Sequence, residues 1–113
     1  MKLTEVKEVL CAKVFAQENE MNREVCSAFA CDLMSDVLAF VEDQSLLLTG
    51  LINPQVIKTA EMMDMKAIVF VRGKEPTDDI IELANESGIV LMSTELTMYY
   101  ASGKLYSSGL YIK

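Results

Sequence analysis

Short apolar runs alternate with amphipathic segments through the second half of the chain. Leu46 to Thr49, Ala67 to Val71 and Ile89 to Met92 are almost wholly apolar, and each precedes a segment with helical periodicity. The runs recur about every 22 residues, the length of one strand, one crossover helix and two short loops. Strands that alternate with helices pair in parallel, because antiparallel neighbours need only hairpins. The pattern predicts an α/β fold: a three-layer βα-repeat domain with a mostly parallel central sheet and helices on both faces.

The predicted helices carry start and stop signals. Asn53 is a cap and Pro54 occupies the favoured first helical position of one helix. Thr77 is the expected cap of the next helix, which Gly88 ends as a left-handed residue. A third helix is expected through residues 96–100.

The first 31 residues have a weaker pattern. Met1 to Leu10 is typical of a short helix and Cys11 to Ala16 of an edge strand. Glu24 to Cys31 predicts a second strand, with Val25 and Phe29 facing the same side.

A further helix is expected after these strands, with Asp32 as its cap. At the other end of the chain, Tyr111 to Lys113 can add an edge strand. Residues 1–113 contain no linker, so they are expected to form a single domain. The buried stripe of the helix after Asp32 is predicted to consist of Leu33, Val37, Phe40 and Val41.

Charge and composition exclude several kinds of partner. The net charge is -7, so the average field repels nucleic acid and anionic lipid, and neither is expected as a partner. No apolar run approaches the ~20 residues that span a bilayer, and charges interrupt the N-terminus where a signal peptide would be apolar. We therefore expect a cytoplasmic protein.

Few residues offer catalytic or metal chemistry. Cys11, Cys26 and Cys31 predict reduced, buried thiols, and the chain has no histidine and no CxxC pair. No metal site and no cofactor are predicted within one chain. Serine and cysteine nucleophiles lack their usual base, so no catalytic residue is assigned; a transferase or hydrolase that uses Lys74 or Asp32 is a distant alternative.

The strand ends predict one ligand-binding edge, because every turn that leaves a parallel strand lies at the same edge of the sheet. Arg72 and Lys74, with hydroxyls and helix N-termini beside them, suit a small anion or a nucleotide phosphate. Asp32 approaches from the preceding helix. In the alternative reading the glycines turn the chain, the hydroxyls cap helices and the cations are solvated. The candidate binding residues are Thr49, Gly50, Asn53, Arg72, Gly73, Lys74, Ser93 and Thr94.

Neither common nucleotide motif is present at this edge. A P-loop needs a glycine five positions before its Gly-Lys pair and a hydroxyl residue directly after it. Around Gly73 and Lys74 these positions hold Ile68 and Glu75. The turn at residues 49–53 lacks the glycines of a dinucleotide fingerprint.

The eight methionines are expected to be mostly core filler. An exposed patch for self-association is the alternative, which the tyrosines near the C-terminus favour. These tyrosines are Tyr99, Tyr100, Tyr106 and Tyr111.

Several stretches resemble the DRTGG domain, a small α/β module found in HPr kinase/phosphorylases, some phosphate acetyltransferases and certain inorganic pyrophosphatases with CBS domains. They are Leu-Leu-Leu-Thr-Gly (46–50), Ala-Ile-Val-Phe-Val-Arg-Gly-Lys-Glu-Pro (67–76), Ile-Ile-Glu-Leu-Ala (80–84), Gly-Ile-Val-Leu-Met-Ser-Thr (88–94) and residues 30–36. The family signature is altered: residues 51–53 replace its Asp-Arg, and Val71-Arg72-Gly73 replaces its Thr-Gly-Gly.

The resemblance implies a regulatory or oligomerising module without a kinase domain. We expect a non-catalytic homodimer that senses a small anion or nucleotide, or that regulates a protein partner. The alternatives are a purely structural protein–protein interaction domain, or a component of an iron-only hydrogenase or redox regulatory system.

Overall fold

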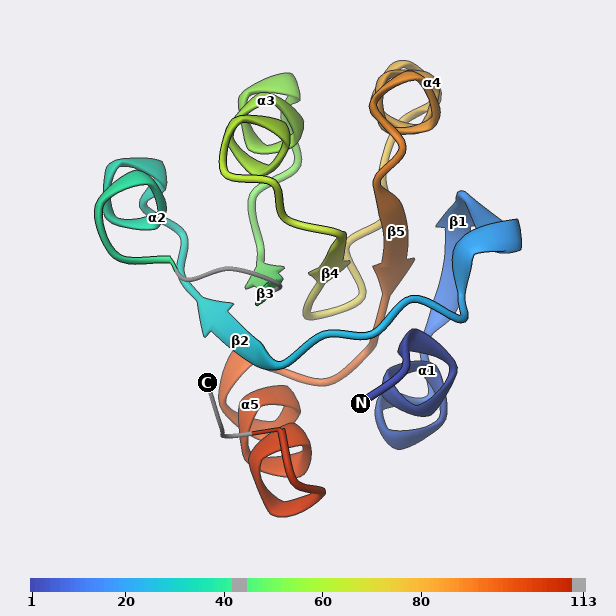
Figure 1. The fold of residues 1–113 in the computed structure, drawn as a ribbon, viewed down its shortest axis with the longest axis vertical. Coiled ribbons are helices and arrows are strands. Elements are labelled where there is room, and N and C mark those ends of the chain that lie inside the picture. The colour runs from blue at the N-terminus through green and yellow to red at the C-terminus, as the bar shows by residue number, and fades with distance from the viewer. Residues whose placement is uncertain (42–44, 111–113) are drawn as a thin grey trace.

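One five-stranded sheet organises the chain (Figure 1). The computed structural model describes residues 1–41 and 45–110, so the strand expected at 111–113 lies outside the described residues. The strand order is β1-β5-β4-β3-β2; β1 is antiparallel to β5 and all other pairs are parallel. The strands are β1 (Lys13–Ala16), β2 (Ser27–Ala30), β3 (Ser45–Thr49), β4 (Ala67–Phe70) and β5 (Val90–Ser93).

Helices cover both faces of this sheet. In Figure 1, α2, α3 and α4 lie on one face, and α1 and α5 lie on the other. The three crossover helices share a face because each joins neighbouring parallel strands in the same direction with the same hand. The predicted fold class is confirmed. The helices are α1 (Leu3–Leu10), α2 (Met34–Phe40), α3 (Pro54–Met62), α4 (Asp78–Ser87) and α5 (Met98–Ser107), with a short 3₁₀ helix, η1, at Glu18–Glu20.

The central strands are apolar throughout because both of their faces are buried. In β3, Leu46 and Leu48 belong to the cluster that faces α1 and α5, whereas Leu47 belongs to the opposite cluster. The neighbouring strand alternates in the same way, with Val69 on one side and Ile68 on the other. Full burial of each such side chain contributes about 1.5–3 kcal/mol.

Most of the predicted helix boundaries are confirmed. The Asn53 Oδ1 accepts a hydrogen bond of 3.1 Å from the Val56 amide at the start of α3. Gly88 ends α4 with a φ of 73°. Thr77 precedes α4 as expected, but its side chain does not cap the helix; its hydroxyl donates to the Asp79 carboxylate instead.

The prediction for the second strand is partly wrong. β2 begins only at Ser27, so Val25 lies before the strand and the alternation rule does not relate it to Phe29. Val25 is buried in the cluster that includes α1 and α5, and Phe29 packs against the cluster on the other face.

The predicted stripe of α2 is also wrong in part. Val37 is fully buried, but Leu33 and Phe40 are 57% and 67% exposed. α2 has only seven residues and lies at the β2 end of the sheet, where few elements are available to cover it. Asp32 does not cap it, since Leu33 occupies the cap position.

The sulfur-containing side chains are less buried than expected. Cys11 and Cys26 are exposed and Cys31 is half-buried, so the prediction of buried thiols fails for the first two; all three are free of disulfides. Met92 fills the core as predicted, but Met62 is 72% exposed.

Candidate ligand-binding site

The carboxyl ends of the parallel strands lie level with one another. Thr49 of β3 is opposite Phe70 of β4, which is opposite Ser93 of β5. The chain leaves β4 towards α4 on one face of the sheet and leaves β5 towards α5 on the other (Figure 1). Ligand crevices of open α/β sheets form where neighbouring exit loops diverge in this way.

In this protein, hydrogen bonds join the two diverging loops directly. The amides of Arg72 and Gly73 donate to the carbonyls of Leu96 and Thr94, each over 2.8 Å. The Ser93 hydroxyl donates to the Lys74 carbonyl. These bonds close the space between the β4 and β5 loops, so a ligand at this edge would bind on the rim.

Asp32 holds the neighbouring exit loop, that of β3. Its Oδ1 accepts a hydrogen bond of 2.8 Å from the Thr49 hydroxyl and one of 2.7 Å from the Gly50 amide. Parallel pairing of β2 with β3 brings Asp32 to this position, since Ala30 lies opposite Leu48. The carboxylate expected at the start of α2 therefore organises the end of β3.

The guanidinium of Arg72 lies over Gly50. A Cβ atom at Gly50 would stand 2.8 Å from the Arg72 Nη2 and 3.7 Å from the Asp32 Oδ2, so glycine permits this close approach. Arg72 itself has a φ of 60°, a left-handed conformation that is unfavourable for a residue with a Cβ. The backbone turn thus directs one cation across the end of the adjacent strand.

Glu95 borders the other side of the same turn, and the sequence reasoning did not select it. A Cβ at Gly73 would stand 2.8 Å from the Glu95 Oε1, and Gly73 has a φ of 70°. Glu95 directly follows Ser93 and Thr94, which end a strand at the predicted ligand-binding edge, and this position in the sequence could have identified Glu95 as a candidate.

The candidate residues divide into two groups. The side chains of Asn53, Ser93 and Thr94 all have partners within the protein; the buried Thr94 hydroxyl donates to the Leu10 carbonyl over 2.7 Å. Arg72 and Lys74 are exposed, and neither forms an ion pair with an acidic residue in the described parts of the chain. Only these cations remain available to attract an anion.

Across residues 1–41 and 45–110, no group of three His, Cys, Asp or Glu side chains is placed to hold an ion. The site can offer two cations and, beside them, the carboxylates of Asp32 and Glu95.

A family profile described as the DRTGG domain matches residues 5–108, nearly the whole chain. The chain belongs to the DRTGG domain family. No curated protein sequence matches this DRTGG domain.

A solved structure shares the fold of this DRTGG domain. It is the crystal structure of the CBS and DRTGG domains of the regulatory region of Clostridium perfringens pyrophosphatase, complexed with the activator diadenosine tetraphosphate. The TM-score is 0.77 at 18% identity, with 95% of this chain covered. This chain spans 46% of that one, slightly less than half its length.

Proposed function

We propose that this DRTGG domain is a non-catalytic regulatory module that binds a small anion or nucleotide on the rim formed by Arg72 and Lys74. One observation carries the proposal: a left-handed turn holds the Arg72 guanidinium over Gly50 without an acidic ion-pair partner among the described residues. A left-handed residue with a Cβ costs about 1–2 kcal/mol, and such conformations cluster at ligand sites.

The surrounding charges favour a nucleotide over a bare anion. Arg72 and Lys74 suit a phosphate group, because a guanidinium can donate two parallel hydrogen bonds to it. The carboxylates of Asp32 and Glu95 lie beside these cations and can accept hydrogen bonds from ribose hydroxyls, which inorganic phosphate lacks. The pyrophosphatase structure with the same fold contains a nucleotide activator, which supports a ligand of this class.

The proposal also includes a cellular location and a mode of association. Within residues 1–41 and 45–110, no helix is long and apolar enough to cross a membrane. We place the module in the cytoplasm, acting as a homodimer or on a protein partner. A purely structural interaction domain is the second candidate, favoured by the internal partners of Asn53, Ser93 and Thr94.

Thermal unfolding in the presence of ATP, diadenosine tetraphosphate or inorganic phosphate tests the site. A ligand at 100 times its dissociation constant adds about 2.7 kcal/mol of stability, which raises the melting temperature by several degrees. We expect this shift with at least one of the nucleotides, and a smaller or no shift with phosphate. The shift should decrease at high salt, because exposed charges are screened.

Substitution of the two rim cations tests where the nucleotide binds. Arg72→Ala and Lys74→Ala should each abolish most of the nucleotide shift, whereas Lys104→Ala, which removes an equal charge from α5, should leave it unchanged. A nucleotide shift that survives in both Arg72→Ala and Lys74→Ala would reject this rim as the site. Absence of a shift with every nucleotide would favour the structural alternative.

A further inference from the structure

The two edges of the sheet are built differently. The β1 edge has an irregular register between Val14 and Ala16, and the Lys13 ammonium lies 5.0 Å from the centre of the Phe15 ring. A bulge and a lysine are devices that prevent an edge strand from pairing with another chain. The β2 edge has neither, since its register against β3 is unbroken over residues 27–30 and it contains no charged residue.

Among residues 1–41 and 45–110, no strand pairs with the outer side of β2. The Cys31 amide donates to the Leu48 carbonyl of β3 over 3.0 Å. Alternate residues of a parallel strand bond to a given neighbour, so the amides of Ala28 and Ala30 point away from β3. Both alanines are exposed.

A small groove lies between β2 and α5 in the described part of the chain. α5 packs against β2 and β3, and the space beside it is a groove of about 150 Å³. Its floor includes Ala28, Ala30 and Leu48, and Tyr106 borders it. Among the described residues, α1 and α5 are the helices on this face, and α5 lies beneath β2.

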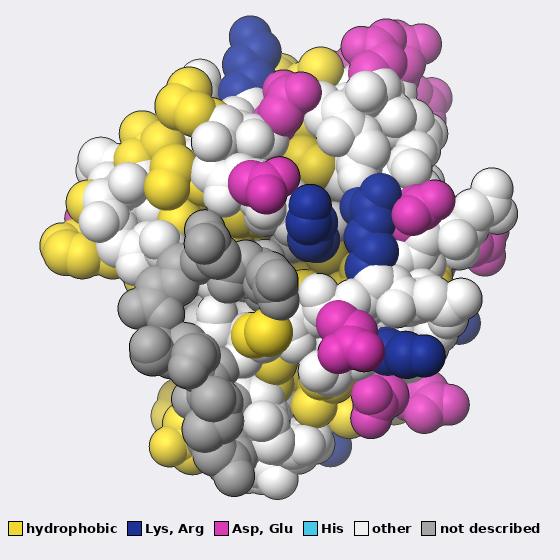
Figure 2. Space-filling view, viewed as in Figure 1, with side chains coloured by type: hydrophobic (Ala, Val, Ile, Leu, Met, Phe, Trp, Pro, Cys, Tyr) yellow, Lys and Arg dark blue, Asp and Glu magenta, His cyan; other side chains and the backbone are white. Residues whose placement is uncertain are grey.

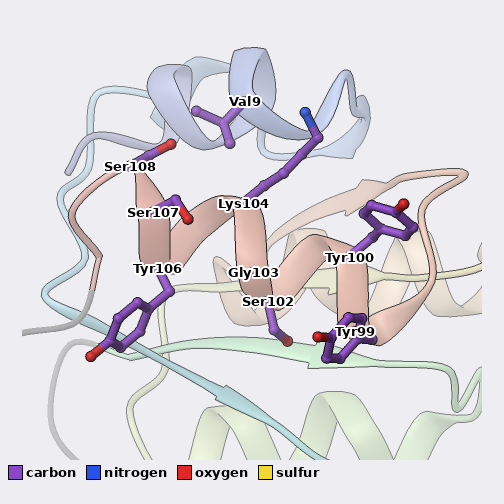
Figure 3. A pocket seen from close by; sticks show the side chains of 9 residues that line it. All are labelled: Val9, Tyr99, Tyr100, Ser102, Gly103, Lys104, Tyr106, Ser107 and Ser108. Carbon is purple, nitrogen blue, oxygen red and sulfur yellow. The ribbon is translucent and has the colours of Figure 1, made fainter.

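α5 presents an exposed stripe on the side of this groove. Tyr99, Ser102 and Tyr106 are spaced at i, i+3 and i+7, and Figure 3 shows them on one side of the helix. Tyr99 and Tyr106 are 87% and 65% exposed. Tyr100 points in a different direction in the same view. A shallow groove of about 840 Å³ runs along α5; both Tyr100 and the stripe residues line it, and it extends to Val9 of α1.

We propose that β2 pairs antiparallel with β2 of a second copy across a two-fold axis, which places the two α5 helices side by side. This inference rests on the proposal that the module is a homodimer, and it identifies the surface through which the two copies bind each other. A net charge of -7 opposes contact between identical copies, except at a surface without charges. The β2 edge is such a surface, and its outward amides and carbonyls are self-complementary under a two-fold.

The spacing of the elements agrees with this arrangement. Paired strands lie about 4.8 Å apart, and α5 packs against both β2 and β3. Two copies joined at β2 would therefore bring their α5 axes to within about 10 Å, the distance at which helices pack. The Tyr99 to Tyr106 stripes would then meet, and tyrosine is enriched in such contacts.

On the other face of the sheet, α2 contributes apolar surface to the proposed interface. Figure 1 places α2 beside β2, and Figure 2 shows apolar side chains gathered in that part of the molecule. Leu33, Leu38 and Phe40 are 57%, 42% and 67% exposed. A stable interface needs about 1,000 Å² or more in total, which a four-residue strand does not supply without its flanking helices.

Sedimentation equilibrium of the full chain tests the proposal. The wild-type protein should have twice the 12.6 kDa mass of the chain. Ala28→Glu and Tyr106→Glu should each weaken self-association at least tenfold, because both place like charges near the two-fold axis. Tyr100→Glu changes an equally exposed tyrosine that points in a different direction in Figure 3; it should weaken the dimer less, because the Tyr100 ring meets the stripe only through its edge contact with Tyr99. Circular dichroism should confirm that all three variants remain folded.

Hydrogen exchange distinguishes the remaining outcomes. The amides of Ala28 and Ala30 should become more protected as protein concentration rises. A dimer that survives both Ala28→Glu and Tyr106→Glu would overturn this surface but not dimerisation. A monomeric wild type would overturn both, and concentration-independent protection of these amides in that monomer would mean that the chain covers its own edge. Neither result bears on ligand binding at Arg72, which the thermal-unfolding experiment tests separately.

Discussion

The Thr49 hydroxyl donates a hydrogen bond of 2.8 Å to the Oδ1 of Asp32, two residues separated by 17 positions in the chain. The same oxygen accepts the Gly50 amide over 2.7 Å. One carboxylate thus joins the end of β2 to the exit loop of β3. It also fixes the glycine over which the Arg72 guanidinium lies.

We expect Asp32→Ala to lower the free energy of unfolding by about 2 kcal/mol, because the buried Thr49 hydroxyl and the Gly50 amide both lose their acceptor. Asp32→Asn keeps an acceptor oxygen and should lose less than half as much. Urea unfolding at one fixed protein concentration measures both values. Equal losses for the two variants would mean that the negative charge, and not the hydrogen bonds, stabilises the loop.

Gly50→Ala should weaken nucleotide binding about tenfold, or about 1.4 kcal/mol, while changing stability by less than about 1 kcal/mol. The new Cβ would collide with the Arg72 Nη2, the far end of a flexible side chain that can move away. Calorimetric titration with the nucleotide identified by the thermal screen measures the affinity. Gly103→Ala is the matched control: apart from its chain neighbours and its own helix backbone, no atom lies within 4 Å of its Cβ position, so binding should be unchanged. Unaltered affinity in Gly50→Ala would show that the position of Arg72 does not matter.

Gly73→Ala should destabilise the fold by about 1–2 kcal/mol from backbone strain, since its φ is 70°. A second loss should come from the contact with the Glu95 carboxylate, which would lie 2.8 Å from the new Cβ. The double variant Gly73→Ala with Glu95→Ala separates the two, because it removes the contact and leaves the strain. Full recovery in the double variant would contradict the strain argument.

The Thr77 hydroxyl donates to the Asp79 carboxylate and so holds the pKa of Asp79 below its ordinary value; the Asp79 and Ile80 amides act in the same direction, and slight desolvation opposes them. A depressed folded-state pKa stabilises the protein at neutral pH, and this contribution is lost as the pH falls through the folded-state value. Thr77→Ala should raise the pKa of Asp79, as measured by nuclear magnetic resonance titration of its carboxyl carbon. Thr97→Ala, at the start of α5, should leave that titration unchanged.

Local pattern was sufficient for the repeated part of the fold. The apolar runs of β3, β4 and β5 predicted parallel strands because a strand buried on both faces contains almost no polar residue. Asn53 and Gly88 marked helix ends through local backbone chemistry, which depends on adjacent residues only. The burial of Leu33 and Phe40 was mispredicted, because a helical period does not reveal whether another element covers the stripe.

The amino-acid sequence by itself determined the α/β class, the parallel repeats and the edge at which Thr49, Arg72 and Ser93 meet, since periodicity and turn chemistry act over short distances. Only the tertiary structure decided that Asp32 holds the Gly50 loop, that Glu95 borders Gly73 and that β2 is the last strand of the sheet among the described residues. These relationships depend on which strands become neighbours and which face each helix covers. Both are set by the packing of residues far apart in the chain.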